Sequence, residues 1–172
     1  MLIVHAAGDP QGRYSRYLAE IVRLEGFVDA AEADLATLDA ATLAAHDLVL
    51  LPRLALARDQ VDLLMGYVVR GGRLLACAPD PALARRCGLA PTFAAVRDGY
   101  LQVDTARPLV RGLCRDRAQV IVPTMGWRVA EGAPVEVLAR VAPAGVSPFA
   151  GTPGVAWAAV GAGAAALVAY DL

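Results

Sequence analysis

The side chain best placed for chemistry is the thiol of Cys77, which ends the apolar run of residues 73–77. A thiol at an exposed strand end acts as a nucleophile when a base lies near it. His5 is the candidate base, because it ends the apolar run of residues 2–4 and parallel strands bring their carboxyl ends to one edge of a sheet. The competing interpretation is that Cys77 is a buried, small apolar side chain and that His5 hydrogen-bonds a loop.

Four charged residues follow predicted strands and could line a small polar pocket at the same edge. They are Asp9, Arg13, Arg53 and Asp80. A small-molecule ligand at this edge is therefore one expectation, and four solvated loop charges are the alternative. Arg13 and Arg53 also leave open a sensor domain that binds a small anion.

Metal and phosphate sites are not predicted. The chain has two histidines and three cysteines without the spacing of a metal site, so we expect no metal and no cofactor. Gly71-Gly72 precedes a predicted strand, and Gly161-Ala162-Gly163 lies between two of them. A phosphate loop instead opens a helix, so neither glycine motif fits one.

The first half of the chain alternates short apolar runs with amphipathic stretches. Strands are predicted at residues 2–5, 27–31, 47–52 and 73–77, and helices at residues 14–25, 38–45, 58–70 and 81–87. In the first helix, Tyr14, Tyr17, Leu18, Ile21 and Val22 are expected to form one apolar stripe. Apolar strands joined by helices predict a mostly parallel sheet with helices on both faces.

The second half has a different pattern, with strand-like runs separated by turn signals. The runs are residues 100–104, 119–123, 135–141, 154–160 and 165–170, with one helical turn near residues 108–113. They predict an antiparallel extension of the sheet that ends in a hairpin. Since there is no repeat or linker, we expect a single α/β domain over residues 1–172.

The bulk composition narrows the class of partner. Hydrophobic residues make up 57% of the chain, and the formal net charge is -1, which argues against nucleic acid or an anionic membrane as a partner. All sixteen basic residues are arginine, a bias that indicates a GC-rich bacterial genome. The odd cysteine count, with no predicted signal peptide or transmembrane helix, favours a cytoplasmic protein.

Two stretches carry a family resemblance: residues 43–52 (LAAHDLVLLP) and 67–75 (YVVRGGRLL). They resemble the class I glutamine amidotransferase-like superfamily, and its non-catalytic branch in particular, which includes the trimerisation domain of some β-galactosidases. Residues 107–113 and the ending 153–172 are similar to the same branch. The resemblance implies a flavodoxin-like fold: a mostly parallel sheet with helices on both faces and an antiparallel C-terminal extension.

The chain departs from the catalytic members of that superfamily. They carry a cysteine on a glycine-flanked turn after the strand that follows Gly-Gly, and a later His and Glu two residues apart. Here Cys77 is followed by Ala78 and Pro79, and both histidines, His5 and His46, lie upstream. Proline also supplies no N–H for an oxyanion hole. The amidotransferase activity is therefore not expected.

The leading hypothesis is a non-catalytic interaction or small-ligand-binding module, linked to carbohydrate metabolism by resemblance alone. The alternative is a cysteine-dependent hydrolase or redox-responsive protein that uses Cys77 with His5. Trp127, Trp157 and Phe149 lie in the antiparallel half and could belong to the core or to a partner surface. We expect a homo-oligomer formed through this half.

Overall fold

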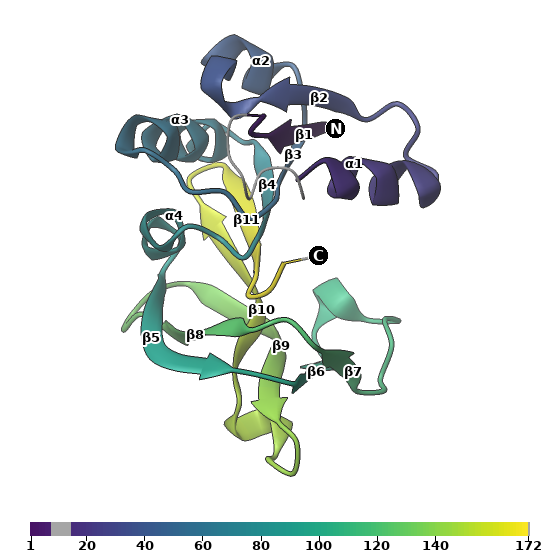
Figure 1. Cartoon of the computed structure of the whole chain (residues 1–172). Coiled ribbons are helices and arrows are strands. Elements are labelled where there is room, and N and C mark those ends of the chain that lie inside the picture. The colour runs from purple at the N-terminus through teal and green to yellow at the C-terminus, as the bar shows by residue number, and fades with distance from the viewer. Residues whose placement is uncertain (8–14, 172) are drawn as a thin grey trace.

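The computed structural model describes residues 1–7 and 15–171. Among these residues, one large sheet has the strand order β2-β1-β3-β4-β11-β10-β9-β6-β7, and a smaller sheet pairs β5 with β8 (Figure 1). The strands of the large sheet are β1 (Leu2–His5), β2 (Ala31–Asp34), β3 (Leu48–Leu51), β4 (Arg73–Cys77), β6 (Gly99–Val103), β7 (Ala118–Val120), β9 (Val135–Pro143), β10 (Thr152–Val160) and β11 (Gly163–Val168). Those of the smaller sheet are β5 (Leu89–Val96) and β8 (Thr124–Val129).

Strand direction divides the large sheet into two parts. From β2 through β1, β3 and β4 to β11, each neighbouring pair is parallel, whereas the pairs from β11 to β7 are antiparallel. The predicted runs that end near Leu51 and Cys77 are parallel neighbours, since Leu51 pairs with Ala76, as the prediction of a mostly parallel sheet requires. The antiparallel extension is also confirmed. Its last strand, β11, returns to pair in parallel with β4 and so closes the two parts into one sheet.

Helices cover both faces of the parallel part. Helix α1 (Ser15–Leu24) lies on one face, and α3 (Arg58–Val69) and α4 (Pro81–Arg86) lie on the other (Figure 1). The remaining helix is α2 (Ala40–Ala44), and short 3-10 turns are η2 (Leu35–Thr37), η3 (Pro108–Val110) and η4 (Pro148–Ala150). Side chains alternate across β1: Leu2 and Val4 join one buried cluster and Ile3 joins the other.

Two glycine motifs from distant parts of the chain lie against each other. The amide of Ala162 donates to the carbonyl of Val69 at 3.0 Å, and the amide of Ala164 donates to the carbonyl of Gly72 at 3.3 Å. A Cβ at Gly163 would lie 2.2 Å from the carbonyl oxygens of Val68 and Gly72. The glycines after α3 and the glycines between β10 and β11 therefore allow close backbone packing between these two segments. This packing places the end of α3 against the start of β11.

Two predictions for the N-terminal part were wrong in detail. The second strand is β2, at Ala31–Asp34, and not residues 27–31. The predicted stripe of α1 is divided: Leu18 is buried and Val22 packs against the core, whereas Tyr17 is 55% and Ile21 44% exposed. Tyr14 lies outside the described residues.

Candidate functional site

A cavity of about 450 Å³ lies at the carboxyl ends of the parallel strands, against the β5–β8 sheet. One wall comes from the loops after β3 and β4 and the segment after β11, with Arg53, Ala78, Pro79 and Ala169. The other comes from β5, β8 and the residue before β8, with Thr92, Ala94, Ala95, Pro123, Thr124, Met125 and Trp127. We call this hollow the edge cavity. It lies where open α/β sheets place their ligands.

The chain turns sharply where β4 meets the edge cavity. Cys77 is the last residue of β4, and Ala78 follows with a φ of 41°, in the left-handed region that an alanine rarely adopts. The Ala78 amide donates to the carbonyls of Val168 at 2.8 Å and Tyr170 at 3.1 Å. The residue at this turn thus lines the cavity without a nucleophilic side chain, and its N–H is already engaged with Val168 and Tyr170.

The Cys77 thiol is held away from solvent. Its side chain is 1% exposed and does not line the edge cavity. Burial raises the pKa of the Cys77 thiol to about 12, and the nearby Asp171 carboxylate adds to the shift. A thiol that stays protonated at neutral pH is a poor nucleophile, so the surroundings of Cys77 suit a packing role.

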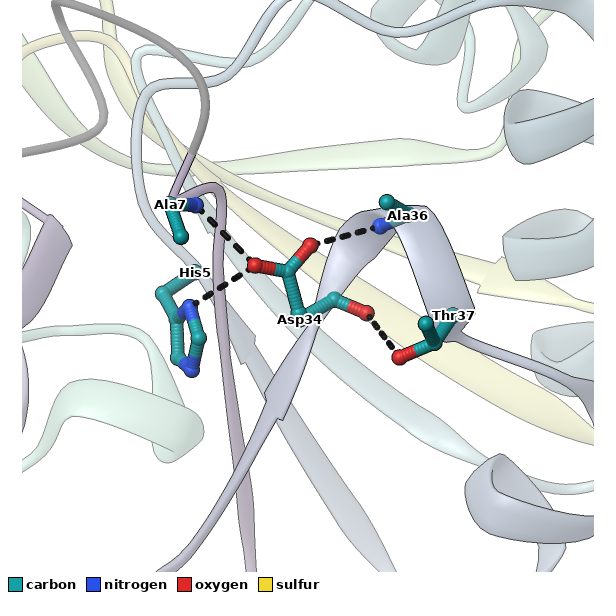
Figure 2. Close-up of polar contacts among 5 residues, drawn as sticks. All are labelled: His5, Ala7, Asp34, Ala36 and Thr37. Atoms are coloured by element: carbon teal, nitrogen blue, oxygen red, sulfur yellow. Dashed lines mark hydrogen bonds and ion pairs between the residues drawn. The ribbon is translucent and has the colours of Figure 1, made fainter.

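His5 has a carboxylate neighbour that was not foreseen from the sequence. Its Nδ1 lies 3.5 Å from Oδ2 of Asp34, the residue that pairs with it across β1 and β2 (Figure 2). Asp34 also accepts from the amides of Ala7 at 3.1 Å and Ala36 at 2.8 Å, and so caps η2. Among the described residues, the His5 Nδ1 atom is buried without a hydrogen bond.

The structure does not bring Cys77 and His5 together. Strand β3 separates the strands that carry them, so two interstrand spacings put their Cα atoms roughly 10 Å apart. The strand register, which pairs Ile3 with Leu50 and Leu50 with Leu75, places His5 and Cys77 at the same level along the sheet. Neither His5 nor Asp34 is among the described residues that line the edge cavity.

The four charged residues predicted at this edge have different positions. Arg53 is exposed and lines the edge cavity. Asp80 caps α4: one carboxylate oxygen accepts from the Ala82 amide at 2.7 Å and the other from the Leu56 amide at 3.4 Å. Asp9 and Arg13 lie outside the described residues.

One hydroxyl group bonds both backbone polar groups of Trp127, a residue of the cavity wall. The Oγ1 atom of Thr152 accepts from the Trp127 amide at 2.6 Å and donates to the Trp127 carbonyl at 2.6 Å. The indole is 3% exposed, and its Nε1 has no hydrogen-bond partner among the described residues. A buried donor without an acceptor is rare, because it loses its hydration and gains nothing in return.

A larger hollow, of about 590 Å³, lies on the antiparallel half of the sheet. Its wall includes Arg107, Arg117, Arg140 and Phe149. Arg107 pairs with Asp104, with Nε 3.0 Å from Oδ2, and Arg140 donates to the Gly151 carbonyl at 2.9 Å. Both guanidinium groups are therefore engaged in local contacts. A ligand in this hollow would meet fewer free guanidinium groups than the three arginines in its wall suggest.

The described part of the chain contains neither a cluster of metal-ligating side chains nor a helix that could span a membrane. No three His, Cys, Asp or Glu side chains there group closely enough to hold a metal ion. No helix there combines the length and the apolar character needed to cross a bilayer.

Thiol labelling of the native chain is expected to distinguish the three cysteines. Cys114 is exposed, whereas Cys77 and Cys87 are buried. A maleimide at neutral pH should therefore modify Cys114 within minutes and leave the other two unmodified until denaturant is added. Peptide mass mapping gives the result, and rapid native modification of Cys77 would contradict the described packing.

Alkaline pH should destabilise the chain partly through Cys77. Since burial raises the pKa of the Cys77 thiol from 9.0 to about 12, the unfolded chain loses this proton first. The stabilisation is complete below pH 9 and is lost as pH rises toward 12. Between pH 8 and 10, one such thiol lowers the free energy of unfolding by about 1.4 kcal/mol.

The variant Cys77→Ala should remove that share of the pH dependence. Urea unfolding at pH 8 and pH 10 measures it, and Cys114→Ala is the exposed control. The described burial of Cys77 would be contradicted if the two variants lost equal stability over this range.

Comparison with known proteins finds a shared fold at low sequence identity. No protein family matches the sequence, and no curated protein does. A β-galactosidase from Rahnella sp. R3 matches over 98% of this chain and 28% of its own, with a TM-score of 0.73 and 17% identity. A putative ThuA-like protein from Bacteroides uniformis matches over 99% of this chain and 80% of its own, with a TM-score of 0.74 and 12% identity.

A cytoplasmic protein from Salmonella typhimurium matches over 90% of this chain and 74% of its own, with a TM-score of 0.68 and 14% identity. At these identities the likeness extends to the fold alone. This chain spans about 28% of the length of the Rahnella β-galactosidase. The class of the protein is thus a mixed α/β domain built like part of a glycosidase chain and like smaller separate proteins.

Proposed function

We propose that the chain is a non-catalytic, glutamine amidotransferase-like domain that binds a small ligand in the edge cavity. The observation that carries the proposal is the turn after β4, where Ala78 adopts a φ of 41° beside the cavity while Cys77 is buried behind it. A catalytic site of this type needs a nucleophile at the strained turn and a base within reach. A methyl group at that position leaves a cavity that can bind but has no group for acyl transfer.

The superfamily assignment is supported by the order of the parallel strands. The run β2-β1-β3-β4-β11 follows the flavodoxin-like order, in which ligands lie at the carboxyl ends of the strands. A role linked to carbohydrate metabolism is supported by the match to the β-galactosidase chain. The three free cysteines fit a bacterial, cytoplasmic setting.

The alternative, a hydrolase or redox-responsive protein using Cys77 with His5, has weaker support. It needs the Cys77 thiolate within hydrogen-bonding reach of His5. The raised pKa of Cys77 and the strand between the two residues both act against it.

A homo-oligomer through the antiparallel half is a further part of the proposal. Of the aromatic residues there, Trp127 is buried, Trp157 is partly buried and Phe149 is 79% exposed. Ile121, after β7, is also 73% exposed, and exposed apolar groups favour a partner surface where they form one patch. Analytical ultracentrifugation at tens of micromolar tests it, and a monomer throughout would refute it.

Thermal unfolding of the intact chain against a panel of small acids, amides, amines and sugars tests the binding function. A ligand at a hundred times its Kd should stabilise the chain by about 2.7 kcal/mol. The matched variant is Ala95→Phe, which puts a ring at an exposed position of the cavity wall and should abolish the stabilisation. If no compound stabilised the chain, or if Ala95→Phe had no effect, the proposed site would be wrong.

A further inference from the structure

We infer that the ligand of the edge cavity is a monocarboxylic acid with an apolar body, such as an arylalkanoic acid. This inference rests on the proposed function and names the chemistry of its ligand. It follows from two features of the wall: one cation and an otherwise largely apolar lining.

The charge in the wall is a single guanidinium. Arg53 is the charged residue among the described residues that line the cavity, and none of the ion pairs described there involves it. The Asp80 carboxylate, on the same edge, is already bound by two amides. A guanidinium with free N–H groups binds a carboxylate through two parallel hydrogen bonds. The site therefore favours one negative charge.

The other polar groups of the wall are already engaged or buried. Trp127 Nε1 is buried away from solvent, so the indole offers the cavity its ring and not its N–H group. The Thr124 hydroxyl donates to the Val122 carbonyl at 3.3 Å, and the Thr92 hydroxyl donates to the Ala94 carbonyl at 3.5 Å. Both hydroxyl protons are thus already used, which leaves the Arg53 guanidinium as the free donor among the described lining side chains.

The rest of the wall is apolar. It consists of Ala78, Pro79, Ala94, Ala95, Pro123, Met125 and Ala169 together with the Trp127 ring. A volume of about 450 Å³ falls in the range of small-molecule sites. Burial of a hydrocarbon or aromatic body against such a wall has a favourable free energy, and the Met125 side chain can adapt to the shape of that body.

The same wall disfavours glutamine and other amino acids. Their ammonium group needs an anionic or multiple-acceptor partner, and no Asp or Glu is among the described lining residues. A phosphate dianion would leave one of its charges unpaired with a single arginine in the wall. The ligand class is therefore distinct from the substrate of a glutaminase.

The test uses the intact chain carrying Trp157→Phe, so that Trp127 is the one remaining indole. Phenylacetate is titrated against the emission of Trp127, and phenylacetamide is the neutral control of the same shape. Phenylacetate is expected to bind about tenfold more tightly than phenylacetamide, because only the acid forms charge-assisted bonds with Arg53.

The substitution Arg53→Gln should bring the two affinities within about twofold of each other. The control Arg85→Gln changes an exposed arginine of α4 that does not line the cavity and should leave the tenfold preference in place. Equal binding of acid and amide to the parent would overturn the carboxylate assignment while leaving the cavity as a binding site. A preference that survives Arg53→Gln would also overturn it. If neither probe bound and no member of the thermal panel did, the proposed function itself would fail.

Discussion

The variant Gly163→Ala is expected to be about 3 kcal/mol less stable than the parent chain. Its new methyl carbon would lie 2.2 Å from the carbonyl oxygens of both Val68 and Gly72. These are backbone atoms of the last turn of α3 and of the α3–β4 connection, so the clash can be relieved only by moving β11 away from them. The contact between the two glycine motifs would be lost, and with it the register of β11 against β4.

The matched control is the same substitution at Gly66, inside α3. There a Cβ would lie 3.3 Å from the Arg70 guanidinium, which is the flexible end of a side chain. Because glycine weakens a helix interior, Gly66→Ala should stabilise the chain by about 0.5–1 kcal/mol. Urea denaturation of both variants gives the two free energies of unfolding. Similar values for Gly163→Ala and the parent would refute the close contact.

Thr152→Val is expected to lower the free energy of unfolding by about 3 kcal/mol, although valine has nearly the shape of threonine. The Thr152 hydroxyl satisfies both the amide and the carbonyl of Trp127, each at 2.6 Å. Its removal leaves two part-buried backbone groups without partners, and each such loss costs about 1–3 kcal/mol. This hydroxyl also joins β10 of the large sheet to β8 of the small one.

Thr152→Ser keeps the hydroxyl and removes only a methyl group, so it should lie within about 1 kcal/mol of the parent. Thermal or urea unfolding distinguishes the two variants. If valine were tolerated as well as serine, the joint between the sheets would not depend on this hydroxyl. Thr152→Val should also weaken binding in the edge cavity, since the position of Trp127 depends on the same bonds.

The parallel core could be predicted because its signals are local. The predicted strand of residues 73–77 coincides with β4, and the predicted helix of residues 58–70 differs from α3 by one residue. The Gly71-Gly72 stop marks the junction between them, since glycine there ends the helix, and Gly71 has a φ of 113°. Apolar runs bounded by such stops identify strands that are buried on both faces.

Strands β5 and β8 could not be predicted, because long-range pairing forms them. Residues 89–96 (LAPTFAAV) include Pro91 and three alanines, and residues 124–129 (TMGWRV) include Gly126. Neither run alternates in polarity. A Cβ at Gly126 would lie 2.2 Å from the Ala94 carbonyl oxygen, so the approach of these two strands depends on a glycine that a sequence pattern would mark as a strand breaker.

The edge cavity was foreseen only in part for the same reason. Arg53 was predicted there from its place after a strand, and it lines the cavity. Trp127 lines the opposite wall because of β8, and its role could not be recognised before that strand was known. The positive φ of Ala78 has no signal in the sequence, because alanine does not favour that conformation.

The central claim is that small ligands bind at the edge cavity, and one measurement tests it directly. A ¹H–¹⁵N correlation spectrum of the intact chain, titrated with phenylacetate, contains two indole N–H signals, from Trp127 and Trp157. We predict that the Trp127 indole signal and the amides of Arg53, Thr92 and Thr124 shift together with one saturating curve, while the Trp157 indole signal stays in place. The claim is contradicted if the largest shifts fall instead on the arginine-lined hollow around Arg117 and Phe149, or if none of these signals moves.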